Sequence, residues 1–471
     1  MCRTRIVCTL GPASSTREVI AEMIEAGMSV ARLNFSHGSR EDHARMAKLV
    51  REAAHASGQH VALLQDLQGP KLRIGPLPAP VELAEGHVLR LVAGGGRATD
   101  EILPVAYEHL ATDVRVGGHV LMDDGRIDLL VEGVGEKEVR CRVVSGGVVS
   151  SHKGINLPGQ PVSAAALSEK DLDDFRFGLT LGVDYVAVSF VRRAADLEQA
   201  RAVMREAGVD VPLIAKIERP EALENLAAII EAADGVMVAR GDLGVEMPIE
   251  QVPNAQKRIT RLANEQRKPV ITATQMLESM IESPSPTRAE ASDVANAVYD
   301  GTDAVMLSGE TATGAHPARV VAMMRRICAA AEQGVLEGAD VPLARSSALA
   351  GPAHAIARSA SLTAREIDAK AIIAFTQSGF TALLLSKEQP AQTIIAVTPS
   401  DAVARRMALY WGVSAVVVSK PKGLDDMMRL IEEGAIASGL GRRGDSIVVV
   451  ARAGGTAPGT NLLQIRTVGD R

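Results

Sequence analysis

The chain of 471 residues is 46% hydrophobic, and its 51 basic and 57 acidic side chains leave a formal net charge of −6. This length exceeds what one hydrophobic core holds and predicts about three domains. The negative balance and the 2% aromatic content argue against a nucleic-acid groove, which needs basic charge and rings for stacking, and against binding to an anionic membrane.

Cysteine usage and hydropathy predict a cytoplasmic protein. The four cysteines are too far apart for a CxxC motif and too sparse for a disulfide framework. The N-terminus offers a five-residue apolar stretch before its first Gly-Pro pair, which is too short for a signal peptide. No run of 18 apolar residues occurs in the sequence, so we expect no membrane span.

Short runs rich in β-branched residues recur along the first two-thirds of the chain. There are eight, at residues 5–10, 30–35, 61–67, 185–190, 213–217, 236–240, 269–274 and 304–309. Their almost continuous apolar character is typical of parallel strands that are buried on both faces.

Helical patterns separate these runs. The clearest is 15–27, with Ser15 and Glu18 at capping-box spacing and Gly27 as its end. Eight β-α units predict a (β/α)8 TIM barrel made of residues 1–71 and 168–335.

The barrel pattern is interrupted between the third and fourth runs, which begin at residues 61 and 185. The interruption starts with the proline-rich segment 75–86, continues with short Val/Leu runs and glycine turns, and ends with "GINLPGQP" at 154–161. We predict that residues 72–167 form a small β-barrel lid domain, hinged on these two linkers. The segment "SEKDLDDFRFG" that follows is predicted to be a helix.

A Gly/Ala/Pro/Ser-rich stretch after about residue 335 indicates a further domain boundary. Beyond it, "AIIAFT", "TIIAVT", "AVVVS", "SIVVVA" and "LLQIRTV" alternate with helical patterns. We therefore expect a C-terminal α/β domain with an open sheet over residues 345–471.

Polar residues fall where the predicted barrel strands end, which is where TIM barrels carry their chemistry. They are Arg32, Asn34, Ser36, Asp66, Lys216, Glu218, Arg240, Asp242, Thr272, Thr274, Ser308 and Glu310. Because side chains alternate along a strand, Lys216 and Glu218 share one face. A structural salt bridge at a sheet edge is the alternative interpretation of that pair.

Two carboxylates from adjacent strands, Glu218 and Asp242, have the hard oxygen ligands that suit Mg²⁺ or Mn²⁺. Lys216 is placed to neutralise a phosphoryl group or an enolate. Arg32 and Arg73 have the planar forks that clamp phosphates, with surface ion pairing as the alternative. The sequence contains no P-loop, no HExxH motif and no Cys/His cluster that would suggest zinc.

These residues lie in motifs that resemble the pyruvate kinase family. The motifs include "TRIVCTLGPAS", "VARLNFSHGS", "AKIERPEALEN", "VMVARGDLGVE", "TATQMLESMIESPSPTRAEASDVANAV" and "AVMLSGETATG", in the family's order. The resemblance implies a glycolytic enzyme that transfers the phosphoryl group of phosphoenolpyruvate to ADP, giving pyruvate and ATP. It also implies a lid inserted after the third strand, a C-terminal domain and a homotetramer, with residues 286–297 as a candidate contact helix.

The resemblance assigns roles residue by residue. Lys216 matches the lysine that stabilises the phosphoryl group in flight, and Glu218 and Asp242 match the ligands of the Mg²⁺. Thr274, Ser308 and Glu310 match groups tied to protonation of the enolate. The substrate-binding positions are Arg32, Lys216, Gly241, Asp242 and Thr274, and the nucleotide-binding positions are Pro12, Asn34, His37, Arg73 and Lys170.

The segment "DLQGPKLRIG" departs from potassium-requiring members of the family. Asn34, Ser36 and Asp66 match potassium ligands, but Leu67-Gln68 replaces Thr-Lys and Lys71 replaces Glu. A lysine ammonium is a compact monovalent cation with three donors. We therefore predict that Lys71 supplies the charge of K⁺ and that the enzyme needs Mg²⁺ or Mn²⁺ but no potassium.

The segment "FTQSGFTALLLSK" at 375–387 resembles the family's effector loop. We expect Thr376, Ser378, Gly379 and Thr381 to bind a sugar phosphate or a nucleotide monophosphate, with an ordinary strand-to-helix turn as the alternative. Two other functions stay open at this stage. They are a Mg²⁺-dependent pyruvate-enolate lyase or aldolase on the same barrel, and a non-catalytic sensor of phosphorylated metabolites.

Overall fold

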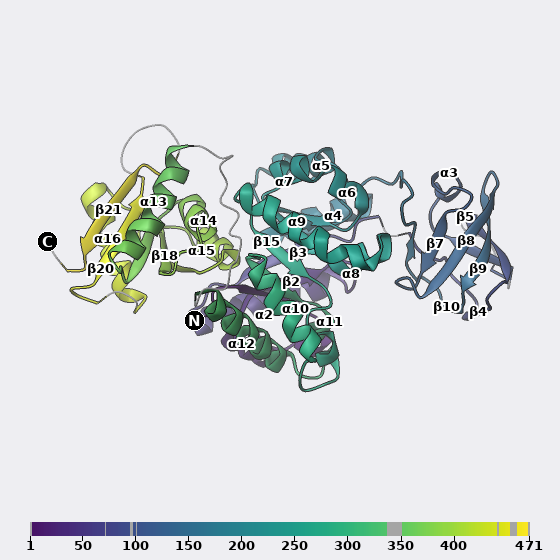
Figure 1. Cartoon of the computed structure of the whole chain (residues 1–471), viewed down its shortest axis with the longest axis horizontal. Helices are drawn as coiled ribbons and strands as arrows, with labels where there is room; N and C mark the ends of the chain where they lie inside the picture. Colours follow the sequence, from purple (N-terminus) through teal and green to yellow (C-terminus); the bar gives the residue numbers. More distant parts are fainter. Residues whose placement is uncertain are drawn as a thin grey trace.

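The computed structural model describes residues 2–70, 72–94, 98–99, 101–336, 351–439, 442–452 and 459–469. Three bodies lie in a row along the long axis of the molecule (Figure 1). The barrel is in the middle, the inserted lid lies at one end, and the C-terminal domain lies at the other. The lid and the C-terminal domain therefore lie at opposite ends of the barrel.

Eight parallel strands close the barrel in the order β1-β16-β15-β14-β13-β12-β3-β2. All eight predicted strands are confirmed: β1 (Arg5–Thr9), β2 (Met28–Asn34), β3 (Ala62–Asp66), β12 (Tyr185–Val188), β13 (Leu213–Ile217), β14 (Gly235–Ala239), β15 (Val270–Ala273) and β16 (Ala304–Leu307). Along β1, Ile6 and Cys8 pack outward with the helices, while Val7 joins a second apolar cluster that lines the interior. Burial on both faces explains the continuous apolar runs.

Helices cover the outside of the barrel. They are α1 (Arg17–Ala26), α2 (Arg40–Ser57), α4 (Glu169–Thr180), α5 (Ala195–Ala207), α6 (Pro220–Glu224), α7 (Leu226–Ala232), α8 (Arg240–Glu246), α9 (Val252–Glu265), α10 (Arg288–Tyr299), α11 (Gly309–Ala312) and α12 (Pro317–Leu336). Short 3-10 helices are η1 (Pro12–Ser14), η2 (Ile249–Gln251) and η3 (Glu278–Ile281). The predicted helix after the lid is confirmed as α4, which Ser168 caps together with Asp171.

The predicted cap of α1 is wrong by one residue. Thr16, in an extended conformation, accepts a hydrogen bond from Val19 N at 3.4 Å and is the N-cap. Ser15 instead donates to the carbonyl of Pro12 at 2.9 Å and ends η1. The Gly-Pro turn before the helix delays its start, which sequence spacing alone does not reveal.

The lid contains β4 (Val81–Leu83), β5 (Val88–Ala93), β6 (Ile102–Val105), α3 (Leu110–Asp113), β7 (His119–Met122), β8 (Ile127–Val134), β9 (Glu138–Ser145), β10 (Gly147–Val149) and β11 (Ile155–Asn156). They form a six-stranded sheet, β11-β7-β8-β9-β5-β6, and the pair β10-β4. Buried and exposed residues alternate along β9. The two sheets enclose an apolar core of their own, from Leu72 to Val162.

Two chain segments connect the lid to the barrel and pair with each other. Arg73 and Gly154 form an antiparallel bridge, and Ile74 N donates to Lys153 O at 2.9 Å. Ile155 N donates to Leu72 O at 2.9 Å. We call residues 72–74 and 153–155 the neck.

The C-terminal domain contains α13 (Pro352–Glu366), β17 (Ala371–Phe375), α14 (Phe380–Lys387), β18 (Thr393–Thr398), α15 (Asp401–Arg406), η4 (Met407–Leu409), β19 (Val413–Val417), α16 (Leu424–Ala437), β20 (Ser446–Ala451) and β21 (Leu462–Thr467). The sheet order is β19-β18-β17-β20-β21, and only β21 is antiparallel to its neighbour. The five predicted strands are confirmed. The predicted start of the C-terminal domain, residue 345, lies outside the described residues.

This domain packs against the barrel end from which the strands begin. Tyr185, in the first position of β12, donates its hydroxyl to Arg406 O at 2.6 Å. Lys387 forms a buried ion pair with Asp303, just before β16. Among the described residues, no helix is long and apolar enough to cross a membrane.

Candidate active site

Lys216 lies at the centre of a charged cluster at the barrel mouth. Its Nζ is 2.7 Å from Glu218 Oε1 and 3.3 Å from Asp66 Oδ1, and it donates to Ser189 Oγ at 2.8 Å. Burial lowers the pKa of Lys216, but the nearby carboxylates more than offset this and raise it above its ordinary value. The lysine is therefore a fixed cation.

The alternative of a salt bridge at a sheet edge does not fit this geometry. The ion pair between Lys216 and Glu218 exists, but β13 pairs with β12 on one side and β14 on the other, in a closed barrel. Both side chains lie at the strand's C-terminal end, and Glu218 is 1% exposed. A buried ion pair contributes little net stability, so its position at the mouth favours a chemical role.

Arg32 completes the cluster from β2. Its Nε donates to Asp66 Oδ2 at 2.6 Å and its Nη1 donates to Thr9 Oγ1 at 2.9 Å. Burial raises the pKa of Asp66, but the charges of Lys216 and Arg32 together hold it below its ordinary value. Two cations and two carboxylates, Asp66 and Glu218, thus meet in one buried place.

Glu218 and Asp242 are the residues that fit a divalent cation. Glu218 Oε2 accepts a hydrogen bond from Phe190 N at 2.7 Å, and Asp242 lies in the first turn of α8, directly after β14. Within the described residues, no cluster of three or more His, Cys, Asp or Glu side chains is arranged to hold a metal. Glu218 and Asp242 supply hard oxygen ligands of the kind that suits Mg²⁺ or Mn²⁺, and a cation held by two residues would keep positions for water and substrate oxygens.

Thr274 and Gly241 are held together across the ends of β15 and β14. Thr274 has a φ of 68°, which is strained for a β-branched residue, and its Oγ1 accepts a hydrogen bond from Gly241 N at 2.7 Å. Arg240 donates to Thr274 O at 2.7 Å and is also 2.7 Å from Asp293. These contacts fix Gly241 and Thr274, two of the predicted substrate-binding positions, relative to each other.

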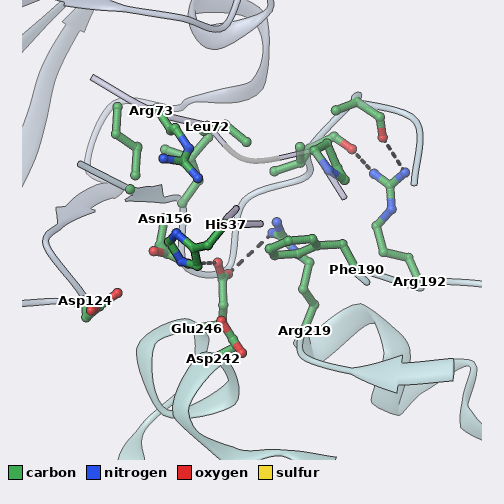
Figure 2. A pocket seen from close by; sticks show the side chains of 16 residues that line it. His37, Leu72, Arg73, Asp124, Asn156, Phe190, Arg192, Arg219, Asp242 and Glu246 are labelled. Carbon is green, nitrogen blue, oxygen red and sulfur yellow. Dashed lines mark hydrogen bonds and ion pairs between the residues drawn. The ribbon is translucent and has the colours of Figure 1, made fainter. Parts of the chain in front are cut away.

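A cavity of about 180 Å³ lies between the barrel mouth and the lid (Figure 2). Three of the predicted site residues line it: Asp242, Arg73 and His37. Arg73 belongs to the neck and donates to His152 O at 3.3 Å. The cavity reaches the charged cluster only through neighbours of Glu218, since Arg219 lines it and so does Phe190, whose N donates to Glu218.

Other predicted residues, among them Lys170, Glu310 and Pro12, do not line this cavity. Lys170, on α4, donates to Asp174 Oδ2 at 2.5 Å and to Phe35 O at 3.2 Å. Glu310, on α11, accepts from Ser308 N at 2.6 Å and Leu277 N at 3.1 Å, and burial raises its pKa. Pro12 is exposed at the start of η1.

The predicted monovalent-cation region is only partly described. Asn34 Oδ1 accepts a hydrogen bond from Ser36 N at 3.1 Å, and Asp66 is paired with Arg32 and Lys216. Leu67 is buried and its carbonyl accepts from Ser189 Oγ at 2.7 Å. Lys71 lies outside the described residues, so its predicted role stays a prediction.

The hydroxyls of the predicted effector loop have local partners. Thr376 Oγ1 accepts from Gly379 N at 2.9 Å, and Ser378 Oγ accepts from Phe380 N at 3.4 Å. The hydroxyls of Thr381 and Thr460 are 2.7 Å apart. The first two bonds form a turn, but the N-cap of α14 is Gly379, which has no side-chain cap, so the predicted Ser/Thr cap is absent. A phosphate would have to compete with these bonds.

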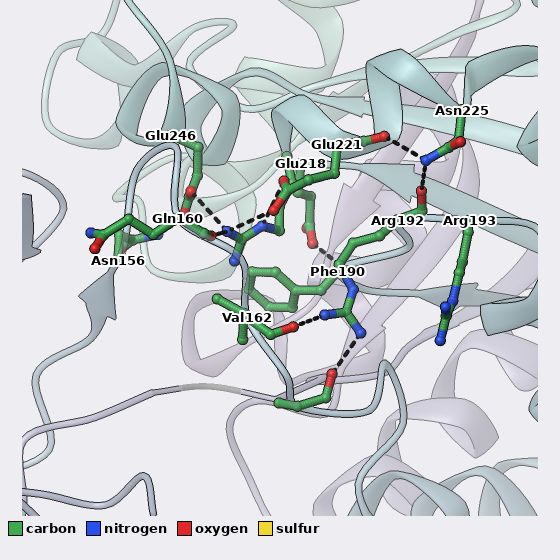
Figure 3. A network of polar contacts seen from close by, with 12 residues as sticks. Asn156, Gln160, Val162, Phe190, Arg192, Arg193, Glu218, Glu221, Asn225 and Glu246 are labelled. Atoms are coloured by element: carbon green, nitrogen blue, oxygen red, sulfur yellow. Dashed lines mark hydrogen bonds and ion pairs between the residues drawn. The ribbon is translucent and has the colours of Figure 1, made fainter. Parts of the chain in front are cut away.

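Sequence reasoning missed a set of polar residues that connect the barrel mouth to the lid (Figure 3). The set is Arg192, Arg219 and Glu246 on the barrel, with Asn156 and Gln160 on the lid side. The sequence carried only a weak signal for these contacts. Arg219 follows Glu218 directly, but it lies beyond the end of β13 and is the N-cap of α6, so alternation along the strand does not place its side chain.

Comparisons with known proteins agree with this architecture. The family model "Pyruvate kinase, barrel domain" matches residues 1–321, and "Pyruvate kinase, alpha/beta domain" matches residues 354–466. Pyruvate kinase of Mycobacterium intracellulare is 46% identical over 473 residues, covering 99% of each chain. That of Corynebacterium glutamicum is 46% identical over 475 residues, covering 99% of this chain and 98% of the relative.

A solved structure shows the same arrangement. The crystal structure of a pyruvate kinase from Cryptosporidium parvum superposes with a TM-score of 0.93 at 38% identity, covering 99% of this chain and 96% of that chain. The family resemblance inferred from the motifs is confirmed. With both domain models matched and relatives similar over almost the full length, the chain belongs to the pyruvate kinase family.

Proposed function

We propose that this protein transfers the phosphoryl group of phosphoenolpyruvate to ADP, with Mg²⁺ or Mn²⁺ held by Glu218 and Asp242. One observation carries the proposal beyond family membership: the buried cation Lys216, fixed between Asp66 and Glu218 at the barrel mouth. Phosphoryl transfer passes through a loose transition state, so it needs positioning and positive charge more than a protein nucleophile.

In this mechanism, Lys216 and Arg32 face the transferring phosphoryl group, and their partners keep them oriented. Neutralisation of charge on the phosphoryl oxygens is the chemistry that the bound divalent cation supplies. Gly241, Asp242 and Thr274 hold the enolpyruvate part.

The second half-reaction protonates the enolate. We assign the proton to a relay through Ser308 and Glu310, near Thr274. The burial that raises the pKa of Glu310 favours the protonated form that a relay needs.

ADP is proposed to bind between the barrel mouth and the lid. Pro12, Asn34, His37, Arg73 and Lys170 are its proposed contacts. The lid, which we delimit at residues 72–167, excludes water from the transferring group and so limits hydrolysis.

Three further properties belong to this proposal. We propose that Lys71 replaces K⁺ beside Asn34, Ser36, Asp66 and Leu67, and that the enzyme is a homotetramer. We also propose that the loop of Thr376, Ser378, Gly379 and Thr381 binds a sugar phosphate or a nucleotide monophosphate. Calorimetry with a panel of such effectors tests the last point, and the absence of heat with all of them contradicts it.

The function is tested by measuring pyruvate formation from phosphoenolpyruvate and ADP with Mg²⁺, in buffer free of sodium and potassium and again with added K⁺. We expect rapid turnover in both buffers. Turnover only with K⁺ would keep the function and overturn the role of Lys71. No turnover in either buffer, together with aldehyde addition to pyruvate, would favour a lyase or aldolase instead.

Lys216→Met is expected to lower kcat by about 10² to 10³-fold, the loss typical for removing a preorganised charge from a transition state. Lys257→Met is the matched control, since Lys257 lies on α9 with a side chain 60% exposed. Equal activity of the two variants would contradict the assignment of Lys216.

A further inference from the structure

The segment that returns from the lid to the barrel is held by side chains that neighbour the metal-binding pair. Arg219 directly follows Glu218 and is 4% exposed. Its Nη2 donates to Gln160 O at 3.1 Å and lies 3.4 Å from Glu246 Oε2. A nearly buried arginine in the cavity wall therefore reaches a backbone carbonyl of the lid side.

Gln160 passes this contact into the body of the lid. Its Oε1 accepts from Arg115 N at 2.9 Å, and its Nε2 donates to His119 O, in β7, at 2.7 Å. Its own carbonyl is the acceptor for Arg219. Gln160 thus joins the start of β7 to Arg219, which follows Glu218 at the barrel mouth.

Glu246 makes a second connection from the helix that carries Asp242. It lies four residues after Asp242 in α8, so both side chains project from the same side of the helix. Its Oε1 accepts from Asn156 Nδ2, in β11 of the lid, at 2.9 Å. Its Oε2 has no hydrogen-bond partner within the described residues and faces Arg219.

Arg192 holds the last part of the return segment. Its guanidinium donates to Val162 O and, at 2.6 Å, to Ala164 O. It follows Phe190 by two residues, and Phe190 N is the donor to Glu218 Oε2. Figure 3 shows these contacts side by side.

We propose that Arg219 and Glu246 are positioning residues that couple the lid to the metal-binding pair. Each is tied in the chain to one member of that pair, Arg219 to Glu218 and Glu246 to Asp242. Each also binds the lid return segment, through Gln160 or Asn156. Movement of the lid away from the barrel breaks these contacts and releases the end of β13 and α8 from their common anchor.

The inference rests on the proposed function, and its test exchanges the donor and acceptor of one contact. Asn156→Asp places a carboxylate against Glu246, and we expect KM for ADP to rise about tenfold, in line with loss of a buried charge-assisted hydrogen bond. Adding Glu246→Gln restores an amide facing a carboxylate, so the double variant is expected to recover most of this loss. Asn254→Asp, on an exposed position of α9, is the matched control and should keep wild-type KM.

Hydrogen exchange of residues 154–166 is measured on the same variants without substrates. We expect faster exchange in Asn156→Asp, and near wild-type exchange in the double variant. Lack of rescue in both KM and exchange, with all variants folded to the same Tm, would overturn the coupling. If the wild-type protein itself fails to form pyruvate, the proposed function fails, and the exchange data still test whether this contact anchors the lid.

Discussion

The junction between the barrel and the C-terminal domain contains an apolar cluster that both domains share, whereas the junction between the barrel and the lid is built from polar contacts. In the first, interior barrel residues such as Ile214 and Met306 belong to one cluster with Met407 and Leu409. In the second, the apolar core of the lid is made, among the described residues, of positions between Leu72 and Val162.

The difference indicates which parts move together. Separating the C-terminal domain from the barrel exposes apolar surface, which costs about 25 cal/mol for each Å². Separating the lid exchanges hydrogen bonds for bonds to water, at a net cost of about 0.5–1.5 kcal/mol each. We therefore expect the barrel and C-terminal domain to move as one body, and the lid to be the part that moves over the cavity.

The largest expected effect on stability comes from breaking the buried ion pair at the junction between the barrel and the C-terminal domain. Lys387 and Asp303 have side chains 2% and 1% exposed. Lys387→Met leaves Asp303 buried without its cation, which should lower the free energy of unfolding by about 3–5 kcal/mol. Urea denaturation followed by circular dichroism measures this loss.

The control for this prediction removes both charges. Lys387→Met with Asp303→Asn keeps an acceptor for the hydrogen bond from Val270 N and leaves no buried charge, so we expect it to regain much of the lost stability. An equal loss in the single and double variants would mean that the ion pair does not hold this junction.

A smaller effect is expected from breaking the second junction. Arg192→Ala removes the donors to Val162 O and Ala164 O, and we expect the free energy of unfolding to change by only about 1 kcal/mol. Proteolysis within residues 160–166 should become faster. Quantitative limited proteolysis, read by mass spectrometry, measures the rate.

The neighbouring arginine provides a matched control. The side chain of Arg193 is 71% exposed and pairs with Asp196, in the first turn of α5. Arg193→Ala should leave proteolysis of the return segment unchanged. Equal acceleration in both variants would show that positive charge before α5, and not the contact to the lid, protects the segment.

The smallest effect is a change in pH dependence at the second junction. Burial raises the pKa of Glu246 above its ordinary value of 4.5, against the opposing effect of Arg219. An acid with a raised folded pKa adds stability that is fully present below pH 4.5 and is lost as pH rises through the folded pKa. Glu246→Gln should therefore gain stability relative to wild type over that rise.

Urea denaturation of wild type and Glu246→Gln at pH values from 4 to 7 tests whether the variant becomes the more stable protein as pH rises. Glu433→Gln, on the exposed face of α16, controls for loss of one carboxylate. A stability difference between wild type and Glu246→Gln that does not depend on pH would contradict the raised pKa.

The fold was largely predictable because its signals are local. Each barrel strand is buried on both faces, so its apolar run appears directly in the sequence, and the glycine and proline linkers mark the inserted lid. The charged cluster was also predictable, since alternation places Lys216 and Glu218 on one face. The start of α1 was not predicted correctly, because a tight turn at Gly11 and Pro12 shifts the N-cap to Thr16.

The connection between the lid and the barrel was not predictable for a different reason. Arg219 and Arg192 bind backbone carbonyls, and any residue type supplies a carbonyl, so the partner carries no sequence signal. Glu246 meets Asn156 across 90 positions. Such a pair is found only once the lid is placed over the barrel.

The paired neck, residues 72–74 and 153–155, also has a consequence for evolution. Because the outgoing and returning segments lie side by side and bond to each other, the distance between the two attachment points does not depend on what is attached. Another compact domain of similar spacing between its ends can replace the lid without opening the barrel. We therefore expect this position to accept changes in the body of the lid, provided that the contacts of Asn156 and Gln160 to the barrel are kept.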